Sequence, residues 1–272
     1  MTPQGNAPAV LFDVDGTLVD SNYLHVHAWY RAFTAVGLSI EAWRIHRSIG
    51  MDGSTLVASL AESADDDTRA RAKDLHSRYY KESASLLCRL PGARELLERV
   101  KALGLQVVLA TSAPEDELSM LRDVVACDDL LSAVTSSKDV DTAKPQPDII
   151  QVALDRAGVD AAHAVFVGDA VWDVEACERA GVPTVGVLSG GVSRDELEKA
   201  GAKAVFENAR DLCEHIDDSP VAALTKALQT QSSAVTHTAI SPRYAPINCT
   251  IKCCASQSSK RWVDQPRTLT RR

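Results

Sequence analysis

The chain has 272 residues, a formal net charge of -8, 45% hydrophobic and 24% charged residues, which excludes a collagen-like or wholly disordered protein. Its seven cysteines are odd in number and form no CxxC pair, so we expect reduced thiols rather than a secreted disulfide framework. No apolar run reaches the length of about eighteen residues that a membrane span needs, and the N-terminus lacks a basic start. We therefore expect a cytoplasmic protein without a membrane partner.

Charge is distributed unevenly along the chain. From Ser219 onward there are eight Lys and Arg residues and one acidic residue, Asp264, so a basic tail follows a strongly acidic body. An acidic body repels a phosphate backbone, and we expect no nucleic-acid partner. Residues 219–272 show no hydrophobic periodicity and are predicted to be disordered. Their three cysteines lack the spacing of the usual zinc sites.

Six short apolar, β-branched runs predict the strands of a parallel sheet. They alternate with amphipathic stretches, the pattern of an α/β protein with a Rossmann-like parallel sheet flanked by helices. The predicted strands are residues 9–13, 105–111, 131–135, 164–168, 184–188 and 202–206. The predicted helices of this core are residues 93–103, 115–125, 147–157, 171–180, 194–200 and 209–216.

A long insertion separates the first two predicted strands. They lie about ninety residues apart in the sequence, whereas a βαβ unit needs roughly thirty. Apolar residues at three-to-four spacing between Leu24 and Val36, and again at Ala72, Leu75 and Tyr79, predict helices in this segment. We therefore predict an α-helical cap, residues 21–87, inserted into a core made of residues 1–20 and 88–218.

Polar side chains that can bind a metal and a phosphate follow the predicted strands. Because parallel strands end at the same edge of a sheet, where α/β proteins bind ligands, we expect these side chains to meet. Taken singly, each is a common turn acid, strand-end hydroxyl, surface lysine or acid of a first helical turn. Together they supply what Mg²⁺ and a phosphate need side by side. In chain order they are Asp13, Asp15, Thr111, Ser112, Lys144, Asp169 and Asp173.

The arrangement resembles the haloacid dehalogenase-like hydrolases, in the subgroup whose helical cap follows the first strand. The resemblance covers about residues 9–216 and implies an Mg²⁺-dependent phosphatase. Such an enzyme hydrolyses a small phosphorylated metabolite, a phosphate monoester, through an aspartyl-phosphate. The segments that resemble the four family motifs are Asp13-Val14-Asp15-Gly16-Thr17, Thr111, Lys144, and Gly168-Asp169 with Asp173.

The resemblance also implies a role for each residue. Asp13 is the expected nucleophile, and Asp15 the expected general acid and base, which calls for a modestly raised pKa. The expected metal ligands are Asp13, Asp169 and the backbone carbonyl of Asp15, while Asp173 acts through water or orients Lys144. The expected phosphate-binding residues are Thr111, Ser112 and Lys144.

Within the cap, three residues are candidates for contact with substrate. His25 matches a histidine that some relatives use to couple substrate binding to cap closure, although a histidine on a helix face is more often a plain surface residue. Arg44 and Arg47 are neighbours if their segment is helical. Two solvated arginines are the alternative interpretation.

Two other functions fit the same residues. The first is a sugar-phosphate mutase similar to β-phosphoglucomutase, although the segment after Gly50 carries no Arg or Lys before Arg69. The second is a non-catalytic binding or regulatory protein on the same scaffold, which we expect to lack Asp13 or Asp15. The sequence leaves open which phosphate ester is the substrate and whether the protein is a monomer or a homodimer.

Overall fold

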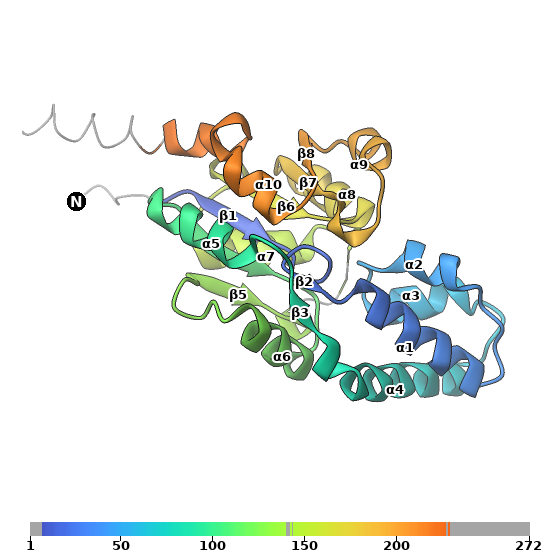
Figure 1. Ribbon diagram of the computed structural model, residues 1–272. Helices are drawn as coiled ribbons and strands as arrows, with labels where there is room; N and C mark the ends of the chain where they lie inside the picture. The colour runs from blue at the N-terminus through green and yellow to red at the C-terminus, as the bar shows by residue number, and fades with distance from the viewer. Residues whose placement is uncertain (1–6, 140–141, 143, 227, 229–272) are drawn as a thin grey trace, which may run out of the picture.

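The computed structural model describes residues 7–139, 142, 144–226 and 228. Six strands form one parallel sheet in the order β5-β4-β1-β6-β7-β8, which confirms the predicted fold class (Figure 1). The strands and helices of this core lie within two residues of their predicted bounds, as is usual for element ends. The strands are β1 Ala9–Phe12, β4 Gln106–Ala110, β5 Ala133–Thr135, β6 Ala164–Gly168, β7 Thr184–Val187 and β8 Ala204–Phe206.

Helices cover both faces of the sheet, because successive side chains of a strand point to opposite faces. In β1, Val10 and Phe12 are fully buried in the hydrophobic cluster under α5 and α10. Leu11, between them, is buried in a second cluster with α7 and α8. Each such large side chain contributes roughly 1.5–3 kcal/mol when fully buried. The helices are α5 Ala93–Ala102, α6 Glu115–Val125, α7 Asp148–Ala157, α8 Val171–Ala180, α9 Arg194–Ala200 and α10 Ala209–Glu214.

Four further helices occupy the long insertion after β1, and we call them the cap helices. They bury a hydrophobic cluster of their own around Trp29, Phe33 and Ile45, with α1 packed along α4. The chain enters and leaves this lobe through β2 (Val19–Asp20) and β3 (Cys88–Arg89), which pair antiparallel (Figure 1). The cap helices are α1 Asn22–Ala35, α2 Ala42–Ser48, α3 Gly53–Leu60 and α4 Asp66–Glu82.

The beginning of the predicted tail differs from the expectation. Residues 221–226 are helical, and Val221 and Leu224 are buried in the same cluster as α5. Their spacing of three residues gives one short apolar face, which is too brief to stand out against the polar composition that follows. The rest of the predicted tail, residues 229–272 with Cys249, Cys253 and Cys254, lies outside the described residues. Within the described residues, none of the helices has the length and apolar character needed to cross a membrane.

Candidate active site

The loop after β1 brings the first two predicted carboxylates to the edge of the sheet. Asp13 directly follows the strand, and a tight turn closes after it, with the Gly16 N–H donating to the Val19 carbonyl at 2.8 Å. Gly16 has φ +71°, and a Cβ there would lie 2.4 Å from both Asn22 Nδ2 and Asp169 Oδ2. Only glycine therefore allows this loop to approach Asp169 so closely.

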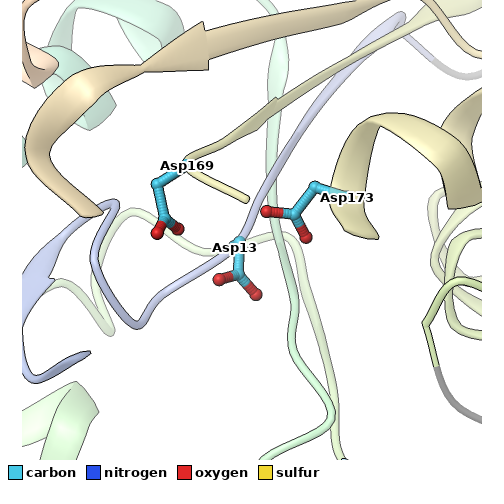
Figure 2. Close-up of side chains that lie close together, drawn as sticks. All are labelled: Asp13, Asp169 and Asp173. Atoms are coloured by element: carbon cyan, nitrogen blue, oxygen red, sulfur yellow. The ribbon is translucent and has the colours of Figure 1, made fainter. Parts of the chain in front are cut away.

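Three buried carboxylates converge at this edge from different elements. Asp13 follows β1, Asp169 follows β6, and Asp173 lies in the first turn of α8; one oxygen of each lies within 4.8 Å of the others. Figure 2 shows the three side chains side by side. The ammonium of Lys144 lies 2.7 Å from Oδ1 of Asp13 and 2.7 Å from Oδ1 of Asp173. The other oxygen of Asp173 accepts the Ala170 N–H at 3.1 Å.

The charge of this cluster fits a divalent cation. Asp169 accepts hydrogen bonds from Thr17 at 3.0 Å and from Asn22 at 2.8 Å, whereas Lys144 forms ion pairs with Asp13 and Asp173. Among the described residues, one ammonium group therefore offsets the charge of three carboxylates. Burial, with the charges of Asp173 and Asp13, raises the pKa of Asp169 well above its ordinary range. Burial, with the charge of Asp173, also raises the pKa of Asp13 to about 7, against the opposing effect of Lys144. An excess of buried carboxylate oxygens over cations is the donor set of a hard metal such as Mg²⁺.

Asp15 contacts the cap helices. Ser21 stands at the N-cap of α1, but its hydroxyl donates to Oδ1 of Asp15 at 2.5 Å instead of capping the helix. His25 Nε2 lies 3.3 Å from the same oxygen. Although burial favours the neutral acid, His25 and Ser21 hold the pKa of Asp15 below its ordinary value. This direction is opposite to the expectation from sequence. Burial lowers the pKa of His25, but the hydrogen bond and the negative charge of Asp15 raise it by more, so the net pKa of His25 is above its ordinary value. The proton shared by this pair therefore lies on the imidazole.

A cavity of about 360 Å³ lies between the sheet edge and the cap helices. Its wall on the sheet side includes the predicted catalytic and phosphate-binding residues, while Asp169 and Asp173 do not line it. Thr111 and Ser112 directly follow β4, and the hydroxyl oxygen of Thr111 accepts the Ala113 N–H at 3.1 Å. The predicted residues that line the cavity are Asp13, Asp15, His25, Thr111, Ser112 and Lys144.

The structure does not bring the two predicted cap arginines to the cavity. Arg44 pairs with Glu41 in its own helical turn, and Arg47 pairs with Glu196 of α9 at 2.5 Å. Neither lines the cavity. The reason is the orientation of α2: Ile45 is fully buried against the other cap helices, which turns the flanking positions toward the rim.

Three residues at the site, two of them in the cavity wall, had no signal in the sequence. His76 Nε2 lies 3.1 Å from His25 Nδ1, and its ring stacks on Trp29 with centroids 3.9 Å apart. Glu117, from the first turn of α6, lines the cavity. Asn22, which donates to Asp169, leaves its own Oδ1 buried without a partner among the described residues. A polar residue inside a helical pattern is usually a solvated one, so only spatial proximity identifies these three.

Comparison with known proteins agrees with this architecture. A family model described as haloacid dehalogenase-like hydrolase matches residues 10–187, and the chain belongs to that family, as its motifs indicated. The phosphoglycolate phosphatase of Rhodospirillum rubrum is 32% identical over 214 residues, which cover 75% of this chain and 88% of that protein. A hydrolase structure from Pseudomonas syringae superposes with a TM-score of 0.75 at 36% identity, covering 78% and 98% of the two chains. A β-phosphoglucomutase structure from Clostridium difficile, with TM-score 0.68 and 19% identity over 85% and 99%, supports the fold alone.

Proposed function

We propose that this protein is a magnesium-dependent phosphatase that hydrolyses the phosphate monoester of a small metabolite through an aspartyl-phosphate. Its family, together with relatives that bear the name phosphoglycolate phosphatase, makes it a phosphatase. The metal, the covalent intermediate and the residue roles are the proposal. One observation carries it: Asp13 opens onto the cavity beside the oxygen-rich cluster, with Asp15 two residues away. A cytoplasmic location stays a prediction.

Asp13 is positioned to act as the nucleophile. Lys144 occupies its Oδ1 at 2.7 Å, while no described residue donates a hydrogen bond to its Oδ2, which is therefore available to attack phosphorus. The new bond joins Oδ2 to phosphorus as the ester oxygen departs, so one hard hydrolysis becomes two easier displacements. Held by Asp13, Asp169 and the Asp15 carbonyl, Mg²⁺ would offset the repulsion between the nucleophile and the phosphoryl oxygens.

Asp15 and His25 would transfer the proton that the leaving group needs. The imidazole of His25 holds the proton of the pair and lies 3.3 Å from the Asp15 carboxylate. We expect the proton to pass through Asp15 to the departing alkoxide, giving the free alcohol. Asp15 then takes a proton from the water that attacks the aspartyl-phosphate, which releases inorganic phosphate and restores Asp13.

Thr111, Ser112 and Lys144 would hold the transferring phosphoryl group. All three line the cavity, Thr111 and Ser112 from directly after β4 and Lys144 from the segment before α7. Lys144 keeps its charge although it is 1% exposed: burial opposes the ammonium form, but Asp13 and Asp173 raise its pKa above the ordinary value. A fixed ammonium neutralises the phosphoryl oxygens as charge develops on them.

Phosphate release distinguishes the three candidate functions. The purified protein would be incubated with phosphoglycolate, sugar phosphates, nucleotides and phosphonoacetaldehyde, with and without a chelator. A phosphatase releases inorganic phosphate in proportion to the substrate consumed, and the chelator stops the release. A mutase consumes substrate without a matching release, and a non-catalytic protein consumes none. Either of the last two results would refute the proposal.

A further inference from the structure

Glu117 is a buried carboxylate that the proposed chemistry does not use. It lies in the first turn of α6 with Glu115 and Asp116, which are exposed to solvent, whereas Glu117 is only 4% exposed. Acids in a first turn gain from the helix dipole wherever they stand. Burying one costs free energy unless a partner compensates it, so the dipole does not explain why this acid faces inward.

The partners of Glu117 leave one of its oxygens without a hydrogen-bond donor. Its Oε1 accepts a hydrogen bond from the Ser77 hydroxyl of α4 at 3.1 Å. Within the described part of the chain, no group donates to Oε2, and Glu117 forms no ion pair. The residue lines the cavity. Oε2 is thus a hydrogen-bond acceptor without a donor among the described residues, on a side chain that borders this space and that Ser77 holds through its other oxygen.

The cation that acts on Glu117, the imidazolium of His25, is already paired with Asp15 at 3.3 Å, so its charge is not free to hold an anion beside Glu117. Beside it on α4, His76 is neutral, because burial and the charge of His25 hold its pKa well below the ordinary value. The lysine of the cap wall, Lys73, is exposed at the rim, where its ammonium donates to the Ser54 hydroxyl at 2.6 Å. A substrate carboxylate placed against Glu117 would meet a like charge. A hydroxyl would instead donate to Oε2 and satisfy it.

We propose that Glu117 selects the leaving group, by accepting a hydrogen bond from a substrate hydroxyl, so that the enzyme prefers phosphate esters of polyhydroxy compounds to those of hydroxy acids. This inference rests on the proposed phosphatase function. It also separates the chain from relatives named for phosphoglycolate, a phosphate ester that bears a carboxylate. A site that pairs a buried polar group with its substrate rejects analogues that leave the group unpaired.

The test uses substrate pairs of equal chain length that differ only in a terminal hydroxymethyl or carboxylate group. Suitable pairs are 2-hydroxyethyl phosphate with phosphoglycolate, glycerol 1-phosphate with 3-phosphoglycerate, and erythritol 4-phosphate with 4-phosphoerythronate. The readout is the ratio of kcat/KM within each pair, for the wild-type protein and for Glu117→Gln. Because both members meet the same catalytic residues, general damage to the enzyme cancels in the ratio.

We expect the wild-type protein to prefer the hydroxyl member in at least one pair by about tenfold or more, and Glu117→Gln to abolish most of that preference. The control is Lys81→Met, which breaks the neighbouring exposed ion pair between Lys81 and Asp116 and should leave the ratio unchanged. Three results would overturn the inference: a wild-type preference for the carboxylate members, no turnover of any pair, or a Glu117→Gln variant that slows both members equally.

Failure of the underlying phosphatase function is recognised separately. Hydrolysis of p-nitrophenyl phosphate, which has neither a hydroxyl nor a carboxylate, depends on Asp13 but needs no contact with Glu117. If this hydrolysis is absent, or persists in Asp13→Asn, the proposed function itself is refuted. If it is present and depends on Asp13, the paired substrates decide the role of Glu117 alone.

Discussion

The ammonium of Lys144 lies 2.7 Å from Oδ1 of Asp13, although 131 positions separate the two residues in the chain. Both are buried, with Lys144 1% and Asp13 6% exposed. The contact neutralises part of the acidic cluster and orients the carboxylate that faces the cavity. The same contact therefore stabilises the folded protein and positions the proposed nucleophile.

Replacing Lys144 by methionine should destabilise the protein and stop turnover. Removing one member of a buried ion pair leaves the other uncompensated, at a cost of about 3–5 kcal/mol. The measurement is urea unfolding in chelator near neutral pH, with Lys138→Met as the control because Lys138 is exposed. An unfolding free energy equal to that of the wild-type protein would show that Asp13 and Asp173 do not depend on this cation.

Replacing Asp13 by asparagine should reduce phosphate release by at least about 10³-fold while the protein stays folded, since an amide cannot act as the nucleophile. Circular dichroism checks the fold, and Asp20→Asn, at an exposed position on β2, serves as the matched control. Activity of Asp13→Asn above a small fraction of the wild-type value would contradict the role of Asp13.

Magnesium should stabilise the wild-type protein against heat, and a chelator should reverse the effect. A ligand that binds only the folded state at about one hundred times its Kd adds about 2.7 kcal/mol. Asp169→Asn removes one carboxylate of the cluster and should lose most of this gain. The comparison is the shift in melting temperature on adding magnesium to each protein. Equal shifts in the two proteins would place the ion elsewhere.

Replacing Glu117 by glutamine should stabilise the protein more at higher pH. Burial raises the pKa of Glu117 above its ordinary value of 4.5, so the folded state binds this proton more tightly than the unfolded state. The stabilising contribution of the proton is present at low pH and is lost as the pH rises through the raised pKa. The difference in unfolding free energy between Glu117→Gln and the wild-type protein should therefore grow as the pH rises above the ordinary value of 4.5 and level off above the raised pKa. A difference that stays constant would show that Glu117 has an ordinary pKa.

Replacing Arg44 by methionine should change little. Its guanidinium pairs with Glu41 on the surface of α2, 42% exposed, and exposed pairs of this kind contribute about 0–1 kcal/mol. We expect kcat/KM for phosphate esters to stay within about twofold of the wild-type value. A decrease in kcat/KM of tenfold or more would indicate that Arg44 contacts the substrate.

The sequence by itself determined the sheet, its helices and the residues at its active edge. In β1 the apolar run stops at Phe12 and Asp13 follows, and in β4 it stops at Ala110 and Thr111 follows. The position where each apolar run stops therefore predicts both the end of the strand and the polar residue at the edge of the sheet. Because parallel strands all end at one edge, knowing where each strand stops was enough to predict which side chains would meet.

Only the tertiary structure decided which group faces which. Glu117 has the same sequence context as the exposed acids beside it, and its burial depends on how α6 meets α4. The short distance between His25 and Asp15 likewise depends on how the cap helices close over the sheet. Periodicity reports which side of an element is buried, but not the element that covers it, and the charge of a buried carboxyl group depends on the groups that tertiary packing places around it.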